Sequence, residues 1–231
     1  MTAMIDISVA ARALEGESPT RILAWASQHL QKLTFATGFG AEGCVLIDLI
    51  ARANLPIDLF TLDTGVLFPE TYELWQRLEE RYGITIRAVR PEPQAVEAGH
   101  WLRDSDACCE VRKVRPLRAA LAGFDAWITA IRRDQTAERA SAKVVEHDRK
   151  FDLVKVNPLV GWTHDDVWGH LYANDVPFNP LHERGYPSIG CQPCTSAIVP
   201  GENLRAGRWR GAAKKECGLH TSQPVQAKEK P

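Results

Sequence analysis

The sequence predicts an α/β domain in which a mostly parallel, twisted sheet is flanked by helices. Short apolar runs at 32–37, 56–62 and 84–89 alternate with segments of helical length. Strands separated by helices indicate right-handed crossovers, and such crossovers place neighbouring strands parallel. A glycine turn, Gly38–Gly40, joins the first apolar run to its helix, as is common in α/β units.

The composition is that of an ordinary globular chain. Of 231 residues, 45% are hydrophobic and 25% are charged, and 28 Lys and Arg nearly balance 29 Asp and Glu. No global positive field is therefore available to hold nucleic acid or an anionic membrane. The sequence has no apolar run of 18 residues, and its first residues carry acids where a signal peptide carries bases. We expect a cytoplasmic protein with neither nucleic acid nor membrane as partner; homo-oligomer formation stays open.

The first elements are bounded by capping residues. Ser18-Pro19 predicts the N-cap and first residue of a helix that ends near Leu30. The run 32–37 is a predicted strand, and 41–53 is the helix after Gly38–Gly40. A strand, a tight glycine turn and a helix present backbone N–H groups to a phosphate, although many α/β units have such turns without a ligand.

Two turns fall where a parallel sheet usually binds ligands. The predicted strand 56–62 ends at Asp63–Gly65, and a helix follows from Pro69 to Gly83 before the third strand, 84–89. Ligands of such sheets bind at the carboxyl ends of the strands. Both Asp63–Gly65 and the earlier glycine turn occupy that position.

The second half of the chain continues the pattern less regularly. A helix is predicted at 116–121, and strands are predicted at 125–131 and 151–159. Between those strands, residues 136–150 are expected to form a mobile loop or an insertion. The capping-box pattern Thr163–Asp166 predicts the start of another helix.

Four cysteines form two pairs that could share one metal group: Cys108 with Cys109, and Cys191 with Cys194. Neighbouring Cα atoms lie about 3.8 Å apart, closer than the roughly 4.4–6.8 Å usual across a disulfide. Adjacent side chains also diverge, which favours different irons of one cubane cluster over one tetrahedral zinc ion. Zinc, buried thiols and a redox disulfide between Cys191 and Cys194 remain as alternatives.

The chain after residue 200 loses its apolar periodicity. We expect an α/β domain over 1–200 and a mobile C-terminal segment over 201–231, whose last eleven residues look disordered. Cys217 lies in this segment among basic side chains, which favour the thiolate that a nucleophile needs. These side chains are Lys214, Lys215 and His220.

The motifs of the chain resemble those of one family in order and type. They are FGAE, LDTG, FPETY and RDSDACCEVRKVRPL within 39–117, RRDQ, VNPL and WTHDDVW within 132–168, VPFNPLHERGYPSIGCQPCT at 176–195, and GRW and KKECGLH within 207–220. On these motifs the chain resembles the assimilatory adenylyl-sulfate reductases, the iron-sulfur branch of the phosphoadenylyl-sulfate reductase family. It departs from the usual pattern at Val66, where an arginine is frequent, and at Ala130, where a glycine is usual.

The resemblance also implies a fold. The helix-turn region is similar to the adenine nucleotide alpha hydrolase-like fold of the ATP pyrophosphatases. Their phosphate loop reads Ser-Gly-Gly-x-Asp-Ser, and the stretch from Thr37 to Glu42 has lost that pattern. The loss argues against ATP cleavage.

The activity that the resemblance implies is thioredoxin-dependent reduction of adenylyl sulfate to sulfite and AMP. Cys217 is the implied nucleophile, which forms an S-sulfocysteine. The implied cofactor is one [4Fe–4S] cluster held by Cys108, Cys109, Cys191 and Cys194. The implied substrate contacts are basic side chains and two strand-end turns: Lys113, Arg132, Arg205, Arg208 and His220, with Gly38, Phe39, Gly40, Glu42, Leu62, Asp63, Thr64 and Gly65.

Two alternatives compete with this function. The first is a 3′-phosphoadenylyl-sulfate or dual-substrate reductase, although the branch restricted to that substrate resembles this chain without the four paired cysteines. The second is a non-enzymatic iron-sulfur redox sensor. A sensor has no need of a terminal thiol in a basic setting.

Overall fold

The structure, a computed structural model, describes residues 5–212, 214 and 216–220. Six strands form one sheet in the order β3-β2-β1-β4-β6-β5. Neighbours pair parallel except β5, which runs antiparallel to β6 at one edge. The predicted α/β class is therefore confirmed. The strands are β1 (Leu33–Thr37), β2 (Asp58–Leu62), β3 (Arg87–Val89), β4 (Ala126–Ile128), β5 (Val145–Asp148) and β6 (Leu153–Val156).

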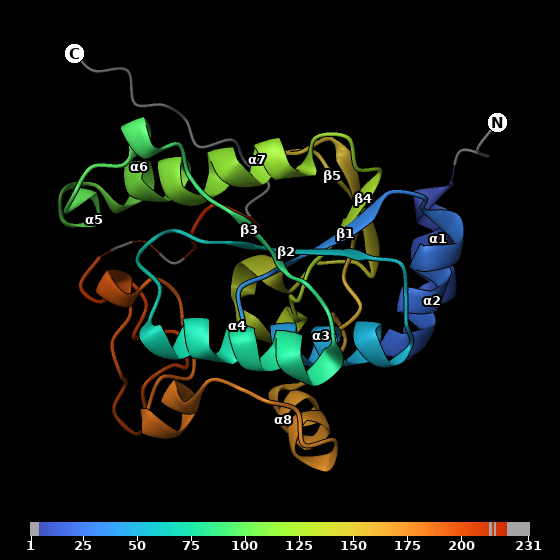
Figure 1. Ribbon diagram of the computed structural model, residues 1–231. Helices are drawn as coiled ribbons and strands as arrows, with labels where there is room; N and C mark the ends of the chain where they lie inside the picture. The colour runs from blue at the N-terminus through green and yellow to red at the C-terminus, as the bar shows by residue number, and fades with distance from the viewer. Residues whose placement is uncertain (1–4, 213, 215, 221–231) are drawn as a thin grey trace.

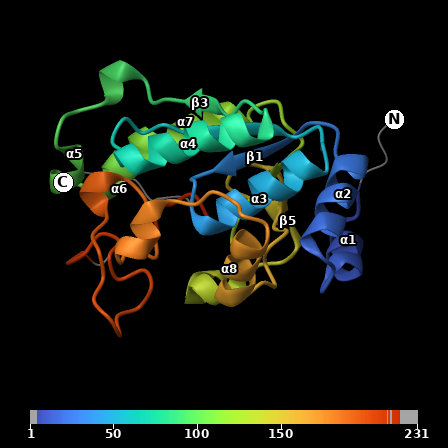
Figure 2. The ribbon, with the colours of Figure 1, turned by 60° about the horizontal axis from the view of Figure 1, so that its bottom comes forward.

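Helices cover both faces of the sheet (Figure 1). Helices α3, α4 and α8 lie on one face, and α5, α6 and α7 lie on the other; α1 and α2 lie beside the sheet, where α1 packs against β5 (Figure 2). No helix in the described part of the chain is both long and apolar enough to cross a membrane. The bounds are α1 (Ile7–Leu14), α2 (Pro19–His29), α3 (Ala41–Arg52), α4 (Pro69–Tyr82), α5 (His100–Arg103), α6 (Ser105–Cys109), α7 (Arg115–Leu121) and α8 (His164–Ala173).

Two hydrophobic clusters hold the layers together. The larger fills the space between the sheet and α2, α3, α4 and α8. The smaller lies under α7, and Leu219 from the end of the described chain packs against it. Burial of these side chains is the main favourable term for folding, so the C-terminal segment shares in the core. The smaller cluster consists of Phe60, Leu117, Leu121, Trp127 and Phe151.

The capping residues act as the sequence predicts. Ser18 Oγ accepts a hydrogen bond from the Arg21 N–H at 3.3 Å, which satisfies one free donor at the start of α2. Gly83 ends α4 with φ 61°, a conformation that glycine adopts without steric cost. At α8, Thr163 and Asp166 form the predicted capping box.

One stretch differs from its prediction as a mobile loop or an insertion, and one helix was not predicted. Residues 136–150 are not simply a mobile loop, because β5 lies within them and forms a hairpin with β6. Val144 and Val145 are buried in the larger cluster, and the burial of their side chains stabilises β5 against the rest of the domain. Helix α1 was also not expected, although Asp6 caps it by accepting from the N–H groups of Ser8 and Val9.

Residues 201–212 pack back on the main domain. The Ser196 N–H donates to the carbonyl of Gly207 at 2.9 Å, and the Trp209 N–H donates to the carbonyl of Cys194 at 2.9 Å. A Cβ on Gly207 would overlap the carbonyl of Ser196, which explains the glycine at this position. The first part of the segment 201–231, which we predicted to be mobile, is therefore packed against the main domain. The last eleven residues of the chain lie outside the described part.

Candidate active site

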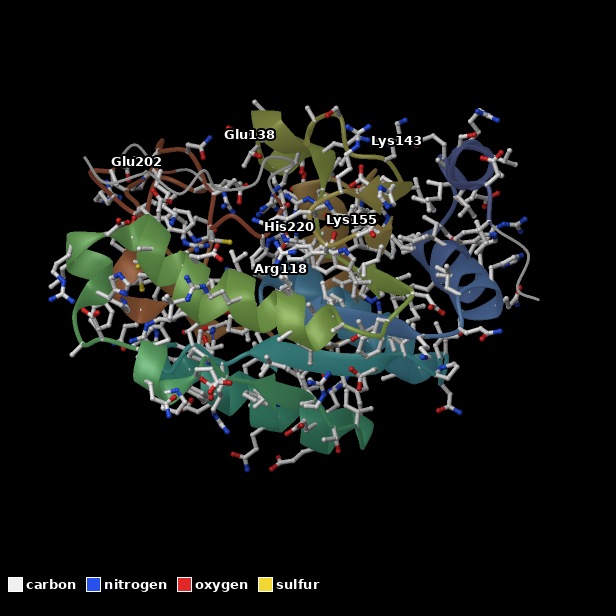
Figure 3. The ribbon with its side chains drawn as sticks, turned by 90° about the horizontal axis from the view of Figure 1, so that it is seen from above. Arg118, Glu138, Lys143, Lys155, Glu202 and His220 are labelled. Atoms are coloured by element: carbon white, nitrogen blue, oxygen red, sulfur yellow. The ribbon has the colours of Figure 1, made fainter. Side chains whose placement is uncertain are left out.

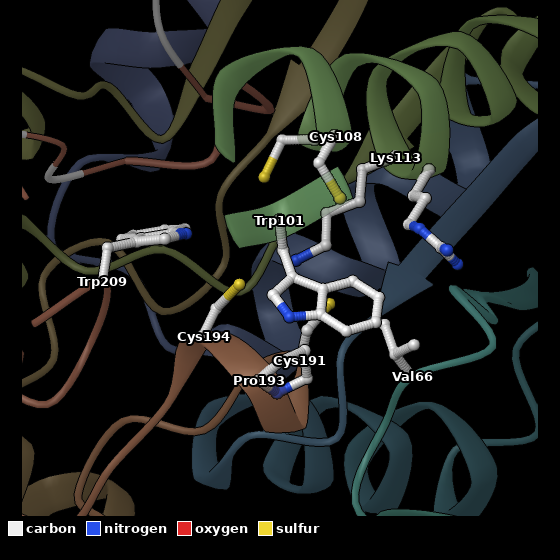
Figure 4. Close-up of a pocket in the computed structure, with 10 residues that line it drawn as sticks. Val66, Trp101, Cys108, Lys113, Cys191, Pro193, Cys194 and Trp209 are labelled. Carbon is white, nitrogen blue, oxygen red and sulfur yellow. The ribbon is translucent and has the colours of Figure 1, made fainter. Parts of the chain in front are cut away.

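The four paired cysteines line one cavity. Cys108 and Cys109 come from α6, and Cys191 and Cys194 come from the short turn Gln192–Cys194 and the residue before it. The cavity has about 300 Å³ of space, part of it open to solvent. Figure 4 shows Cys191 and Cys194 facing the helix that carries Cys108. The rest of the lining is Val66, Trp101, Arg112, Lys113, Pro193 and Trp209.

Backbone contacts fix the two pairs relative to each other. The Gln192 N–H donates to the carbonyl of Val66 at 2.8 Å, and Thr64 Oγ1 lies 3.3 Å from the Cys191 sulfur. On the other side, Asp104 caps α6 by accepting from the N–H groups of Asp106 and Ala107. The second predicted turn, Leu62–Gly65, therefore lies against the cysteine cavity.

A π-helical turn, Glu110–Val114, follows the two adjacent cysteines directly. Such turns are rare and occur frequently at functional sites. Arg112 from this turn is buried, donates to the carbonyl of Thr64 at 2.5 Å and lies 5.7 Å from the Trp101 ring. The π turn thus directs two cations, Arg112 and Lys113, at the cavity.

Lys113 lies between several thiols. Burial acts to lower its pKa, but Cys191, Cys217 and Cys109 raise it above its usual value. In turn, burial acts to raise the pKa of Cys191, and Lys113, Thr64 and Arg208 outweigh it, so that this pKa is lowered. Lys113 is therefore a cation that serves both the cavity and Cys217.

The donor set of the cavity is four thiols. In the described part of the chain, no three His, Cys, Asp or Glu side chains are grouped tightly enough to hold one metal ion. Four thiols instead surround a cavity, with cations and two indole rings as its walls. Soft thiolate ligands arranged in this way suit an iron-sulfur cluster.

A second hollow lies at the carboxyl ends of the central strands. It has about 1180 Å³ of space, part of it open to solvent, and we call it the strand-end cleft. Seven predicted site residues line it. They come from the turn after β1, the start of α3, the stretch after β4, the 201–212 segment and the end of the described chain: Gly38, Gly40, Glu42, Arg132, Arg205, Arg208 and His220.

The glycine turn is shaped by close packing. A Cβ on Gly43 would lie 2.8 Å from Thr37 Oγ1, so α3 can start this near to β1 only with a glycine there. Phe39 points inward instead of toward the cleft: it is buried and stacks on Trp75 with ring centroids 5.5 Å apart. Phe39 therefore shapes the turn through packing.

The cleft's arginines are already in contact with acids or carbonyls. Arg132 pairs with Glu42 and, at 2.8 Å, with Asp134. Arg205 pairs with Glu216 at 3.3 Å, and Arg208 donates to the carbonyl of Ile189 at 3.3 Å. A Cβ on Gly190 would overlap the Arg208 guanidinium.

Asp63 is the acid of the second predicted turn. Burial opposes its ionisation, but donors from Tyr72, the Gly65 N–H and Arg90 hold its pKa below its usual value. Tyr72 donates at 2.7 Å and Arg90 at 2.9 Å. The turn Leu62–Gly65 is thus held rigidly, and it does not line the cleft that Gly38 and Gly40 line.

The described residues of the C-terminal end, 214 and 216–220, contact the main domain, and His220 lines the strand-end cleft. We call these residues the terminal segment. Lys214 Nζ donates to the carbonyl of Ser105 at 2.8 Å, and Lys150 donates to the carbonyl of Gly218. The predicted role of Lys215 lies outside the described residues. Cys217 is half-buried, and the charges of Lys113, Lys150 and Arg205 act on it.

His220 stacks on Trp127 with ring centroids 5.6 Å apart and an interplanar angle of 14°. Burial and the nearby cations Arg139, Lys155 and Arg205 hold its pKa well below the usual value. His220 therefore adds no positive charge beside Cys217, contrary to the prediction that grouped it with the lysines. Figure 3 shows His220 next to Lys155.

Sequence reasoning missed Arg139, Lys150 and Trp127. Arg139 and Lys150 lie in the stretch expected to be a loop or insertion, and they contact the terminal segment. His182, which lines the cleft, was also missed. One local feature of the sequence could have pointed to Arg139. It follows Gln135 by four residues, and the two side chains interact in the structure.

Comparison with known proteins places the chain in a family. Residues 32–197 match the phosphoadenosine phosphosulfate reductase domain. The chain is 48% identical over 207 residues to adenosine 5′-phosphosulfate reductase 1 of Bacillus subtilis, covering 86% of this chain and 89% of that protein. It is 44% identical over 216 residues to the adenosine 5′-phosphosulfate reductase of Oceanobacillus iheyensis, covering 90% of both.

Solved structures agree. The phosphoadenylyl-sulfate (PAPS) reductase of Candida auris, in a phosphate complex, superposes with a TM-score of 0.75 at 28% identity, covering 86% of this chain and 98% of that one. Yeast FAD synthetase, with a TM-score of 0.54 at 20% identity, covering 83% of this chain and 65% of that one, shares the fold alone. The resemblance read from the motifs is confirmed, and the chain belongs to the phosphoadenosine phosphosulfate reductase family.

Proposed function

We propose that this protein reduces adenylyl sulfate to sulfite and AMP with thioredoxin as the electron donor. The observation that carries the proposal is the position of Cys217, which interacts electrostatically with Lys113 of the cysteine cavity and with Arg205 of the strand-end cleft. Lys113 interacts electrostatically with Cys217 as well as with Cys191 and Cys109. The names of the bacterial relatives support adenylyl sulfate as the substrate.

The chemistry requires a nucleophile and a site for anions. The Cys217 thiolate attacks the sulfur of the sulfuryl group, the bond from that sulfur to the bridging oxygen breaks, and AMP leaves with the electron pair. A thioredoxin thiolate then attacks the Cys217 sulfur, and sulfite leaves with the electrons of the S–S bond. The second thioredoxin thiol resolves the mixed disulfide, which returns Cys217 as thiolate and oxidises thioredoxin.

The cleft residues bind and orient the substrate in this proposal. Arg205 and Arg208, with Lys113 and Arg132, hold the phosphosulfate, because guanidinium forks fit oxyanions in two places at once. The Gly38–Glu42 turn at the start of α3 offers backbone N–H groups to the nucleotide. The phosphate in the Candida auris relative supports an anion site in this fold. In place of the predicted nucleotide contact, we assign the turn Leu62–Gly65 to the side of the cysteine cavity, because Thr64 Oγ1 lies 3.3 Å from the Cys191 sulfur.

The cysteine cavity is proposed to hold a [4Fe–4S] cluster through Cys108, Cys109, Cys191 and Cys194. The cluster would supply structure and an electrostatic field, and the scheme requires no change in its oxidation state. All six cysteines are free thiols in the structure, which suits a cytoplasmic setting where disulfides are rare. Metal analysis tests this assignment: anaerobically purified protein should be brown and contain iron and sulfide in equal amounts, and zinc at full occupancy would contradict it.

An anaerobic assay tests the function. The protein is supplied with reduced thioredoxin and either adenylyl sulfate or its 3′-phosphorylated form, and sulfite and AMP, or 3′-phospho-AMP, are measured. We expect sulfite from adenylyl sulfate. Equal rates with both nucleotides would show dual use, preference for the 3′-phosphorylated form would overturn the substrate assignment, and no sulfite from either would favour a redox sensor.

A further inference from the structure

The contacts of Glu216, the residue directly before Cys217, stand out in the cleft. Its carboxylate meets the guanidinium of Arg139 through two bonds, from Nε at 3.0 Å and from Nη2 at 2.9 Å. Both side chains are nearly buried, with 10% of Arg139 and 7% of Glu216 exposed. A two-pronged ion pair at such low exposure is geometrically specific and costly to break from one side.

Arg139 is itself held in place from behind. It donates to the side-chain oxygen of Gln135, and Gln135 Nε2 donates to Glu42 Oε1 at 2.9 Å. Glu42 belongs to the glycine turn at the start of α3. A continuous set of contacts therefore runs from the proposed nucleotide turn to the residue before the nucleophile.

The terminal segment makes other contacts on both sides of Glu216. Lys214 Nζ lies 2.8 Å from the Ser105 carbonyl and pairs with Asp106 at 2.8 Å. Lys150 reaches the carbonyl of Gly218, and the ring of His220 stacks on Trp127. Arg205 Nη2 contacts Glu216 at 3.3 Å, a longer contact than those from Arg139, and Arg205 also lines the cleft. Of these contacts, the Arg139 pair fixes both the position and the orientation of the backbone next to Cys217.

We propose that Arg139 is a positioning residue that holds Glu216 and thereby places Cys217 over the cleft. The inference rests on the proposed function, since it assigns the site to the same reaction. Arg205 can move from Glu216 to an incoming phosphosulfate while Arg139 keeps the segment docked. Release of the Arg139–Glu216 pair opens the segment and presents the sulfur adduct to thioredoxin.

The first test measures how accessible Cys217 is, which does not depend on turnover. Anaerobic holoprotein is treated with iodoacetamide without substrate, and alkylation of the peptide that contains Cys217 is followed by mass spectrometry. Glu216→Gln keeps the shape of the side chain and removes its charge. We expect about tenfold faster alkylation in this variant and in Arg139→Gln, because local opening becomes more frequent. Alkylation at the wild-type rate in both variants would overturn the proposal.

The second test is a double-mutant cycle on turnover. In Glu216→Gln, kcat should fall about tenfold while the KM for adenylyl sulfate changes less than about twofold, since the nucleotide site is intact. The double variant Arg139→Gln/Glu216→Gln should be no slower than the slower single variant, because neither charge is then left unpaired. Additive losses would mean that the two residues act separately and would contradict the pair.

Matched variants keep the outcome interpretable. Arg149→Gln changes an exposed arginine on the same stretch of chain and should leave alkylation and kcat unchanged. The absorbance of the holoprotein checks that each variant is folded; where Glu216→Gln fails that check, Glu216→Asp replaces it and should show the same faster alkylation. If wild-type protein reduces neither nucleotide, the proposed function fails, and the alkylation rates still decide the pair.

Discussion

The strand-end cleft and the cysteine cavity both contain buried cations, but they balance the charges differently. In the cleft, carboxylates face the guanidinium groups: Glu42 and Asp134 pair with Arg132, and Glu216 pairs with Arg139 and Arg205. In the cavity, Arg112 and Lys113 face a backbone carbonyl, an indole ring and thiols.

The difference agrees with the occupants that we propose for the two hollows. The carboxylates hold the cations of the cleft in place, and a substrate anion can replace a carboxylate as the partner of a cation. The cleft therefore suits a ligand that binds and dissociates in each turnover. Thiols fixed around Lys113 suit a resident anionic group, because a buried cation requires permanent compensation. Cys217 interacts electrostatically with one cation of each hollow, Lys113 and Arg205.

Cys217→Ser should have the largest effect. We expect kcat to fall by more than about 10³-fold, because a serine hydroxyl cannot replace the thiolate in either step, while iron content and AMP binding stay at wild-type levels. Wild-type protein incubated with adenylyl sulfate and no thioredoxin should gain the mass of one sulfonate on the peptide containing Cys217. An adduct on Cys44, which is fully buried in the core, or full activity of the variant would refute this role.

Lys113→Ala tests the cation shared by the two hollows. We expect kcat to fall about 100-fold, since a preorganised charge at the reacting group is lost, and Lys113→Arg should recover part of it. The exposed Lys143→Ala is the control and should behave like wild type. Steady-state kinetics and cluster absorbance are measured together. A change in KM alone would place Lys113 in nucleotide binding only.

Arg205→Ala and Arg208→Ala compare a cation that faces a carboxylate with one that faces a carbonyl. Each should lower kcat/KM about tenfold or more, and the loss should be larger for Arg208, because Glu216 already offsets part of the charge of Arg205. Arg210→Ala, which removes an exposed pair with Glu202, serves as the control. Wild-type kinetics in both variants would mean that the phosphosulfate site is misplaced.

Replacement of His182 should have the smallest effect, a change in how the stability of the protein depends on pH. Burial lowers its pKa from the usual 6.5; Glu42 acts in the opposite direction, and His164 adds to the lowering. Because the pKa of His182 is lowered in the folded state, the contribution of His182 to the free energy of unfolding is complete above pH 6.5. This contribution is lost as the pH falls through the folded-state pKa. His182→Gln should therefore narrow the fall in thermal midpoint between pH 7.5 and 5.5, as measured by circular dichroism.

The size of that change is bounded. One titrating group alters the free energy of unfolding by at most about 1.4 kcal/mol per pH unit, which is a few degrees in the midpoint. Asp63, whose pKa is also lowered, loses its contribution only near and below its usual 3.8 and does not interfere. An identical fall in both proteins would exclude His182 as the cause.

The sequence by itself determined the α/β class, the helix starts and the residue types of the site. Apolar runs, Ser18-Pro19 and the Thr163–Asp166 box are local patterns, and local sterics and capping make them readable without a fold. The motifs also identified the family, which the comparisons confirm. The roles of the cysteines and of Cys217 were read in the same way and stay predictions.

Only the tertiary structure decided which residues meet. Val145 joins the sheet because its strand is buried against distant side chains, and the Arg139–Glu216 pair joins residues 77 positions apart. The low charge on His220 also follows from its surroundings, since burial and neighbouring cations set its pKa and its own sequence context does not. Long-range pairing, burial and desolvation leave no local pattern in a chain, and they are what arranges this site.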